Sequence, residues 1–591
     1  MSKTIGKTEA HPSDNEITPP SSSVRIRIWP AVLIALAQLI AAMLFARFGT
    51  TNIQNGIALG GVPLAATALL ILWWLAASRV PWGERLLGLA IFACAVVAVL
   101  FSQRSVGIGA LLLAVALPYM VYAVAIILLV TQPLRWYVRR FALLCVLIVC
   151  VVVFCAMRVD SIGGDLAPVT SWRWQPTAAQ RSGTLADFLV QQEALLPADA
   201  GPDDWPAFLG PRRDNRIAGV RFADDWHNTP PREIWRREIG PGWSSFIAVG
   251  DYLFTQEQRG EEELVACYRA DTGAPVWRNR VEALFEDAMG LGPRATPVFS
   301  EGYLYTQGGT GILQRLDAAT GETLWRRDLT EDANRGVPGY GFASSPLVLS
   351  EHVVVFTGAD DGNNVIAYDR ATGDIAWSAG RRASGHCSPQ LETLGNMPQI
   401  LMASNFGMQA FNVENGNLLW EHHWDIRTNP RCVQPVVMDN EYVMFGGTGT
   451  SGSRLLHVTR DNNDWQVDEQ WSTRQFRPYF NNGALHEDHY YGYDGDRVAC
   501  LALRTGERQW SGERYGGQLL LVVDMDMLLI LAESGDVALV RATPEQFQEV
   551  ARFPALNGKT WNHPTIHGGR LYLRNSQEAA CYELPGLFAS P

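Results

Sequence analysis

The sequence predicts an all-β eight-bladed propeller of four-stranded antiparallel blades, preceded by an α-helical membrane domain of five spans. Three observations support this fold class. A strand–turn–strand motif that ends in tryptophan recurs through the C-terminal part of the chain. Its copies follow one another at roughly 40–50 residues, a period typical of propeller blades. The N-terminal quarter instead holds five long apolar runs.

The repeated motif is clearest at residues 368–377, which read Tyr-Asp-Arg-Ala-Thr-Gly-Asp-Ile-Ala-Trp. Residues 268–277 and 316–325 have the same form, and 411–420 and 501–510 are weaker copies. Glycine suits a tight turn because it reaches positive φ at no steric cost, and Asp or Asn beside it can bond its own backbone. Each copy therefore predicts a strand, a turn and a second strand that carries tryptophan.

The blade count follows from the repeat and from its two ends. The motif tryptophans are Trp277, Trp325, Trp377, Trp420, Trp471 and Trp510. One period earlier lies Trp235, in a strand with no inner strands before it, and one period later lies Phe553. The final strand set, 565–584, lacks an outer strand. We infer that the strand of Trp235 completes this last blade, which closes the ring at eight blades and removes exposed sheet edges.

The membrane domain is predicted from five apolar runs, each near the ~20 residues that a helix needs to cross hydrocarbon. They are Ile28–Ala46, Gly56–Ala77, Leu86–Phe101, Gly107–Thr131 and Phe141–Met157. No Asp, Glu, Lys, Arg or His lies inside these runs. Ionisable groups within spans usually mark ion or proton paths. The sequence therefore favours an anchoring role for this region and leaves quinone binding open.

Basic residues set the expected orientation. Lys3, Lys7, Arg25 and Arg27 precede the first run, and Arg135, Arg139 and Arg140 lie between the fourth and fifth. Such a bias places the N-terminus in the cytoplasm. Five crossings then predict a multi-pass protein of the cytoplasmic (inner) membrane with an extracytoplasmic, periplasmic propeller. The expected divisions are a disordered cytoplasmic tail at 1–27, the spans at 28–157, a linker at 158–203 with a short helix over 184–196, and the propeller at 204–591.

Composition limits the functional classes. The net charge is −12, which argues against a nucleic-acid partner because binding to a phosphate backbone needs a basic surface. The chain has nine cysteines without a Cys-x-x-Cys or Cys-Cys pair, so no cysteine metal or redox site is expected. No metal site of any other kind is predicted.

The repeated Ala-x-Asp-x-x-Thr-Gly-x-x-x-Trp pattern resembles the tryptophan-docking repeat of the pyrroloquinoline-quinone (PQQ) propeller superfamily. That superfamily includes quinoprotein dehydrogenases and non-catalytic members such as the outer-membrane assembly lipoprotein BamB. The spans before an extracytoplasmic propeller are similar to those of membrane-bound quinoprotein glucose dehydrogenase. The resemblance implies that each tryptophan packs on the turn of the neighbouring blade. It also implies PQQ with calcium as the cofactor that such a propeller would hold, although the calcium ligands of the family cannot be assigned to positions here.

Candidate binding residues come from the segments that enter the innermost strands, because these line the mouth of a propeller channel. Several such strands begin near a proline, and three residues before each proline lie Arg294, Ala343, His386, Cys432 and Trp561. With nearby polar residues they predict a channel-mouth site made of Arg294, His386, Arg431, Asn481, Trp561 and His563. Trp561 would offer a stacking surface, and the two guanidinium groups would bind the carboxylates of an anionic quinone.

Three functions fit these observations. The favoured interpretation is a membrane-anchored, non-enzymatic propeller that binds envelope proteins, a glycan or a small-molecule ligand at the channel. The first alternative is a PQQ-dependent quinoprotein dehydrogenase that oxidises an alcohol or sugar and reduces membrane quinone. The second is a sensor whose membrane half relays a signal.

Overall fold

The computed structural model divides into two compact units, Met1–Met157 and Arg158–Pro591. The residues that it describes are 26–48, 57–103, 106–164, 167–177, 180, 192–426, 430–449, 451–462, 464–586 and 588–589. The expected N-terminal tail lies outside them apart from its last two residues. The expected short helix over 184–196 also lies mostly outside them.

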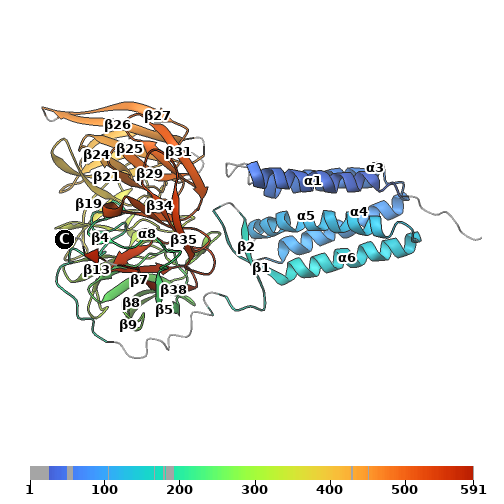
Figure 1. Ribbon diagram of the computed structural model, residues 1–591, viewed down its shortest axis with the longest axis horizontal. Helices are drawn as coiled ribbons and strands as arrows, with labels where there is room; N and C mark the ends of the chain where they lie inside the picture. The colour runs from blue at the N-terminus through green and yellow to red at the C-terminus, as the bar shows by residue number, and fades with distance from the viewer. Residues whose placement is uncertain are drawn as a thin grey trace, which may run out of the picture. The chain divides into compact units, whose positions relative to one another are not determined.

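The first unit is helical (Figure 1). Its helices are α1 (Trp29–Phe48), α3 (Val62–Ala76) with the π-helical turn η1 (Ile57–Gly61) before it, α4 (Trp82–Phe101), α5 (Val106–Val130) and α6 (Trp136–Ala156). Large apolar side chains such as Leu72, Ile126 and Val149 are exposed along them, as suits a hydrocarbon environment.

Four helical segments in the described residues are long and apolar enough to cross a membrane, judged by length and composition. They are Ile57–Ala76, Trp82–Phe101, Val106–Val130 and Trp136–Ala156. The corresponding apolar stretch of α1, Trp29–Phe45, is shorter. Each of the five predicted runs therefore contains a helix. The membrane span predicted for the first run, Ile28–Ala46, is not confirmed. Helices α4 and α6 begin earlier than predicted and include Glu84 and Arg140, which form an ion pair of 2.7 Å.

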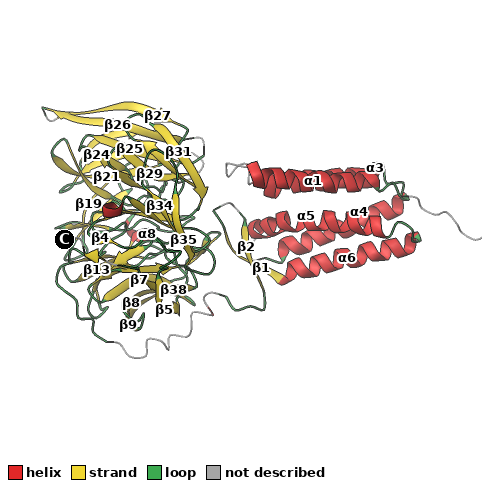
Figure 2. Cartoon of the chain, in the orientation of Figure 1, coloured by secondary structure: helices red, strands yellow, loops and turns green. Residues whose placement is uncertain are grey.

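The second unit is a β-propeller, drawn as strands in Figure 2. Within the described residues it has eight antiparallel blades, which confirms the predicted count. The strands of each blade are given from inner to outer. Blade 1 has β6 (Ile247–Val249), β7 (Tyr252–Arg259), β8 (Glu262–Arg269) and β9 (Pro275–Glu282), and blade 2 has β12 (Val298–Ser300), β13 (Tyr303–Gln307), β14 (Ile312–Asp317) and β15 (Thr323–Asp328). Blade 3 has β16 (Leu347–Val348), β17 (His352–Phe356), β18 (Val365–Asp369) and β19 (Ile375–Ala379), and blade 4 has β20 (Gln390–Leu394), β21 (Met397–Ser404), β22 (Gly407–Asn412) and β23 (Leu418–His423).

Blades 5 to 8 complete the ring. Blade 5 has β24 (Val436–Met438), β25 (Tyr442–Gly447), β26 (Gly452–Asp461) and β27 (Asp464–Thr473), and blade 6 has β28 (Ala484–His486), β29 (His489–Asp494), β30 (Arg497–Ala502) and β31 (Glu507–Arg514). Blade 7 has β32 (Gln518–Val522), β33 (Met527–Leu531), β34 (Asp536–Arg541) and β35 (Glu549–Pro554), and blade 8 has β36 (Thr565–His567), β37 (Arg570–Arg574), β38 (Glu578–Glu583) and β5 (Arg232–Glu238). The hairpin β26–β27 extends beyond its neighbours in Figure 1.

Short elements lie between and beside the blades. They are β1 (Met157–Ile162) paired with β2 (Pro168–Trp172), β10 (Glu286–Asp287) with β11 (Gly290–Leu291), β39 (Phe588–Ala589) with β4 (Val220–Arg221), the helix α8 (Leu329–Asp332), the 3-10 turn η3 (Val523–Met525), and β3 (Arg216–Ile217). Strand β3 adds to blade 7 in parallel with β32, so this blade has a fifth strand that the repeat did not predict.

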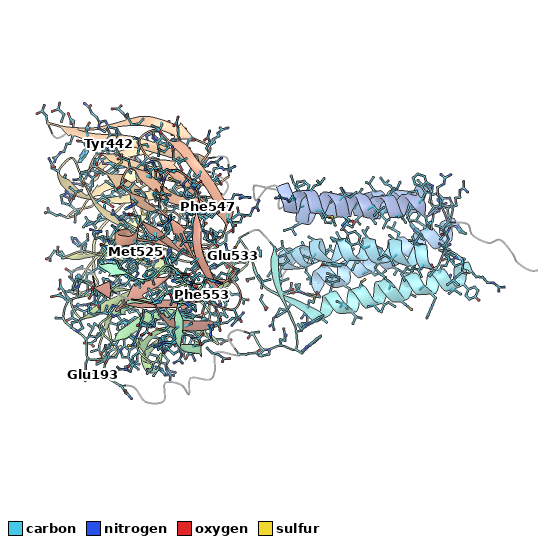
Figure 3. All side chains as sticks on the ribbon, in the orientation of Figure 1. Glu193, Tyr442, Met525, Glu533, Phe547 and Phe553 are labelled. Carbon is cyan, nitrogen blue, oxygen red and sulfur yellow. The ribbon has the colours of Figure 1, made fainter. Side chains whose placement is uncertain are left out.

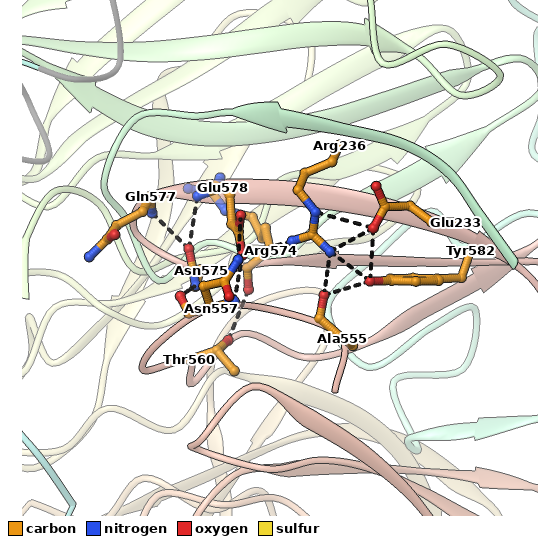
Figure 4. A network of polar contacts seen from close by, with 10 residues as sticks. All are labelled: Glu233, Arg236, Ala555, Asn557, Thr560, Arg574, Asn575, Gln577, Glu578 and Tyr582. Carbon is orange, nitrogen blue, oxygen red and sulfur yellow. Dashed lines mark hydrogen bonds and ion pairs between the residues drawn. The ribbon is translucent and has the colours of Figure 1, made fainter. Parts of the chain in front are cut away.

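The ring closes as predicted, because β5 is the outer strand of blade 8 and pairs Trp235 with Cys581 of β38. Figure 4 shows the polar network at this junction. Arg236 donates to the carboxylate of Glu233 and to the Tyr582 hydroxyl, at 2.8 and 2.7 Å, and also forms an ion pair with Glu578 at 2.8 Å. Segments from the two ends of the propeller sequence are thereby joined in one sheet.

Neighbouring blades are latched by the repeated tryptophans. Within the described part of the chain, five of the seven repeat tryptophans donate through Nε1 to a backbone carbonyl oxygen in the turn of the next blade: Trp235 to Ala270, Trp277 to Ala318, Trp325 to Arg370, Trp471 to Leu503 and Trp510 to Thr543, at 2.7–3.1 Å. Trp420 instead donates to the side chain of Gln399 in its own blade. The turn glycine lies against the ring, and a Cβ at Gly373 would come within 2.8 Å of Trp325. The latch that the resemblance implied is therefore present.

Blade 7 departs from the latch pattern. In the other seven blades, a register shift follows the strand residue that pairs with the latch tryptophan. In blade 7 the shift follows Leu539, which pairs with Ala551. Ala551 therefore occupies the tryptophan position in this blade. Phe553, which the spacing suggested as the equivalent residue, lies two positions further on and pairs with Val537. Its ring packs instead on Trp226 and Tyr582, with centroids 5.3 and 5.0 Å away. The period is preserved in this blade, but the tryptophan latch is replaced by another aromatic contact.

Candidate functional site

A cavity of about 200 Å³ lies where the chain enters the inner strands of the propeller. Seven blades contribute the residue four positions before the first residue of their inner strand, which we call the mouth position. These residues are Trp243, Arg294, Ala343, His386, Cys432, Phe480 and Trp561. In the described residues, blade 7 adds no lining side chain. The spacing before each inner strand therefore brings residues from most of the ring to one site.

A ring of hydrogen bonds holds these entry segments in place. In six of these bonds, the backbone N–H two residues after a mouth position donates to the side chain at the same position in the adjacent blade, and in the seventh it donates to Gln518, the first residue of β32. In the described residues the bonds, of 2.7–3.2 Å, run from His563 to Ser245, Ser245 to Thr296, Thr296 to Ser345, Ser345 to Ser388, Ser388 to Gln434, Gln434 to Asn482 and Asn482 to Gln518. We call this the amide ring. It satisfies buried backbone donors of the entry segments and ties each of these segments to the next blade.

The lead-in, residues 204–216, contacts residues at the inner strands of blades 1, 2, 3, 4 and 7. Trp205 and Ala248 of blade 1 exchange backbone hydrogen bonds of 2.8 and 2.9 Å, and the carbonyl of Pro206 accepts from the N–H of Phe299 in blade 2. Phe208 of the lead-in lines the cavity and packs edge-on against His563, with ring centroids 5.1 Å apart. The segment that precedes the first blade in the sequence thus forms part of the cavity wall.

Two buried side chains fasten the far end of the lead-in. The guanidinium of Arg213 donates to the carbonyls of Pro346, at 2.8 Å, and Pro389, at 3.3 Å, in blades 3 and 4. The amide of Asn215 donates to the carbonyl of Leu519 in blade 7 at 2.8 Å. Burial lowers the pKa of Arg213 to about 10. The lead-in therefore ties several inner strands together through their backbone carbonyls.

A second segment, residues 158–164, reaches the same cavity, and we call it the strap. Gly163 and Gly164 line the cavity. The N–H of Gly164 donates to Oε1 of Glu533 at 2.9 Å, a residue labelled in Figure 3. The carbonyl of Ile162 accepts from Nζ of Lys559 at 2.7 Å. These contacts fix the strap to loops of blades 7 and 8.

Aromatic rings make up much of the cavity wall. Trp561 lies between Trp243 and Phe480, with ring centroids 4.9 Å from each, and Tyr479 packs on Phe480 at 5.0 Å. Lys559 places its Nζ 4.1 Å from the centroid of Trp561, a cation–π distance. The wall can accept a flat apolar surface by stacking.

The single arginine in the lining is already paired. Arg294 forms an ion pair of 2.6 Å with Asp287, and both side chains are about 10% exposed or less. Its guanidinium also lies 4.8 Å from the centroid of Phe285. Burial lowers the pKa of Arg294, although the carboxylate of Asp287 opposes the shift. The pair leaves no net charge at this edge of the cavity.

Four other lining groups, His386, His563, Tyr479 and Cys432, are held in their neutral forms near pH 7. Burial, with the nearby Arg294 and Arg335, lowers the pKa of His386 to about 4. Burial lowers the pKa of His563 to about 3. It raises the pKa of Tyr479 and of Cys432 to about 12. The cavity is therefore polar in places but carries little charge.

Four of the six predicted site residues line the cavity: Arg294, His386, Trp561 and His563. Arg431 and Asn481 do not. Arg431 is buried and donates to the carbonyls of Ser404 and Gly446, with its guanidinium 4.9 Å from the ring of Trp424. The amide of Asn481 donates to the backbone carbonyl of Gly516 at 3.2 Å. In each case the adjacent residue, Cys432 or Asn482, lines the cavity.

Sequence reasoning missed Trp243, Phe480 and Phe208. Blades 1 and 6 have no proline three residues after the mouth position, and a proline at that spacing was the signal that marked the other entry segments. Counting back from the strand starts would have found Trp243 and Phe480. No local pattern marks Phe208, because a contact between the lead-in and the channel arises only when the ring closes.

The lining does not suit a calcium-bound quinone. Calcium takes six to eight oxygen ligands, with carboxylates prominent among them. No Asp or Glu lines the cavity among the described residues, and these residues contain no group of three or more His, Cys, Asp or Glu that could hold a metal. The one lining arginine is engaged by Asp287. We therefore derive no chemical step through PQQ.

Comparison with known proteins identifies relatives of the propeller. Residues 229–337 and 261–512 match the model of a family described as outer membrane protein assembly factor BamB. The chain is 23% identical over 358 residues to the assembly factor BamB of Burkholderia pseudomallei, covering 57% of this chain and 86% of that protein. It is 30% identical over 149 residues to the quinoprotein alcohol dehydrogenase PedH of Pseudomonas putida, covering 22% of each. The matched segment thus spans about a fifth of that dehydrogenase.

Solved structures of both kinds of protein align with part of this chain. BamB from Moraxella catarrhalis aligns with a TM-score of 0.44 and 15% identity, covering 60% of this chain and 99% of that one. The quinohemoprotein alcohol dehydrogenase ADHIIG from Pseudomonas putida HK5 aligns with a TM-score of 0.47 and 13% identity, covering 66% and 83%.

Proposed function

Since the C-terminal region is a PQQ-like, BamB-like propeller, we propose that this protein is a membrane-anchored, non-enzymatic binding module. The helical unit anchors it in the inner membrane, with the N-terminus in the cytoplasm and the propeller on the extracytoplasmic side. The propeller binds an envelope protein, a glycan or a small molecule, with the channel-mouth cavity as its ligand site. The proposed divisions are the tail at 1–27, the membrane domain at 28–157, the linker at 158–203 and the propeller at 204–591.

The composition of the cavity wall carries this proposal. Stacked aromatic rings and neutral polar groups surround it, and among the described residues no acidic side chain lines it. Binding pockets commonly combine an apolar lining with a few polar groups that orient the ligand. An oxidation would need a base to take the substrate proton and a cofactor to take the electrons. The neutral lining residues His386 and His563 could accept a proton, but the lining does not fit the calcium form of the cofactor.

The test is a titration of the full-length protein, held in lipid nanodiscs, with PQQ and calcium. Absorbance would report binding, and a dye-linked assay with primary alcohols and aldose sugars would report oxidation. We expect neither saturable PQQ binding nor turnover. Stoichiometric PQQ binding together with substrate oxidation would contradict the proposal.

The second candidate is a PQQ-dependent dehydrogenase that passes electrons to membrane quinone. The identity with PedH over 149 residues supports it. It requires that PQQ bind without a carboxylate-based calcium site in the cavity. The same titration separates the two candidates, because only the dehydrogenase would couple PQQ binding to oxidation.

A further inference from the structure

The cavity has the dimensions of a site for one small ring system. Its volume of about 200 Å³ lies below the ~300–1,000 Å³ of pockets that enclose drug-sized ligands. Trp243, Trp561 and Phe480 form a continuous aromatic wall, with centroids 4.9 Å apart at each step. A flat ring gains dispersion and quadrupole interactions against such a wall. Size and wall together favour a ligand of one or two fused rings.

Polar groups with spare hydrogen-bonding capacity line the same cavity. The imidazole of His386 and the hydroxyls of Tyr340 and Tyr479 make no side-chain hydrogen bond within the described part of the chain. Tyr340 lies edge-on to His386, with ring centroids 5.7 Å apart. Tyr340 is 37% exposed, and His386 and Tyr479 are half-buried, so a ligand at this edge would compete with water for them. These three groups can therefore bond oxygen or nitrogen atoms at the edge of a ligand.

Among the described lining residues, the arginine is paired with a carboxylate. Arg294 is neutralised by Asp287 at 2.6 Å. Lys559, which is not a lining residue, directs its ammonium to the carbonyl of Ile162 at 2.7 Å. An anionic ligand would lose its hydration here without gaining an unengaged cation among the lining residues, and burial of an uncompensated charge is costly.

Building on the proposed function, we propose that the cavity binds one uncharged planar aromatic or heteroaromatic ring with hydrogen-bonding atoms at its edge. It discriminates against the same ring when that ring carries a carboxylate. The proposed ligand class thus lacks the negative charge of the tricarboxylate quinone that related propellers would suggest. Trp561 is the central stacking residue, because it contacts both Trp243 and Phe480.

A matched pair of probes tests this proposal: coumarin, which is neutral and bicyclic with a carbonyl acceptor, and coumarin-3-carboxylate. Binding to the full chain in nanodiscs is measured by calorimetry, with empty nanodiscs subtracted. We expect saturable binding of coumarin, and binding of the carboxylate at least about tenfold weaker. Trp561→Ala should weaken coumarin binding about tenfold, since stacking on an aromatic side chain contributes ~1–3 kcal/mol. Trp561→Phe, which keeps a ring, should retain most of the affinity.

Trp174→Ala serves as the control, because Trp174 is 70% exposed and lies outside the cavity lining. Thermal melting of each variant shows whether the propeller remains folded. The proposal is overturned if neither probe binds, if the carboxylate binds as tightly as coumarin, or if folded Trp561→Ala binds coumarin like the unmodified protein. None of these outcomes removes a protein-binding role. That role is contradicted separately, by PQQ-dependent oxidation.

Discussion

The indole Nε1 of Trp235 donates a 3.0 Å hydrogen bond to the backbone carbonyl oxygen of Ala270, and this contact joins the last blade of the propeller to the first. Trp235 is also the residue that pairs with Cys581 in blade 8. One side chain therefore takes part in both steps of ring closure, completing the sheet of one blade and latching that sheet to the next.

Trp235→Ala should destabilise the propeller by about 3–5 kcal/mol, the usual cost of removing a buried tryptophan side chain. Urea unfolding followed by circular dichroism measures the change. The exposed Trp174→Ala variant should differ little from the unmodified protein. Equal midpoints for the two variants would show that the latch contributes nothing to closure.

Gly321→Ala and Gly302→Ala separate packing against the latch from backbone strain. Both glycines have positive φ, of +75° and +78°. A Cβ at Gly321 would overlap the ring of Trp277, whereas a Cβ at Gly302 would meet nothing within 4 Å. Both variants should lose the ~1–2 kcal/mol that a left-handed conformation costs an L-residue. Gly321→Ala should lose about 1–3 kcal/mol more through overpacking. A comparison of the two free energies of unfolding checks this, and equal losses would contradict it.

Arg213→Met should destabilise the propeller by about 1–3 kcal/mol, because it leaves inner-strand carbonyls such as those of Pro346 and Pro389 without their donor. We also expect faster proteolysis within the lead-in. The neighbouring Arg212→Met variant is the control, since the side chain of Arg212 is 68% exposed. If both variants resist protease equally, the lead-in does not depend on Arg213.

His386 should make the propeller less stable in acid. Its folded-state pKa is about 4, below the ordinary 6.5, so the unfolded chain binds its proton at a higher pH. Above pH 6.5 His386 is neutral in both the folded and the unfolded chain, and the free energy of unfolding has its full value. As the pH falls from 6.5 toward 4, the unfolded chain binds a proton at His386 and the free energy of unfolding decreases progressively. His386→Leu should reduce the slope of stability against pH in this window by up to about 1.4 kcal/mol per pH unit. Denaturant midpoints from pH 7 to 4 measure it, and an unchanged slope would show that His386 does not titrate as described.

Glu533→Ala should release the strap, because the carboxylate of Glu533 accepts the hydrogen bond from the N–H of Gly164. Hydrogen exchange at Gly164, followed by mass spectrometry, should become faster while exchange in the blade strands stays unchanged. Ser534→Ala is the matched control, since Ser534 is exposed and adjacent in the chain. Unchanged exchange in Glu533→Ala would mean that other contacts hold the strap.

Much of the candidate site could be located from the sequence because its residues occupy a repeated position. Once the start of an inner strand is known, the mouth position follows by counting, as it did for Arg294, His386 and Trp561. Arg431 and Asn481 show the limit of this approach. Each lies next to a lining residue, and alternation along an extended segment turns adjacent side chains to different environments. An error of one residue therefore replaces a lining group with a buried one.

The sequence by itself determined the propeller, its eight blades and the closure through Trp235, since each follows from a local motif and its period, and the resemblance of that motif to a known repeat implied the tryptophan latch. Only the tertiary structure decided what fills the channel mouth. The lead-in and the strap reach the cavity through contacts between residues far apart in the chain, such as Arg213 with Pro389 and Gly164 with Glu533. No local propensity encodes such contacts, because they form only after the ring has brought the inner strands together.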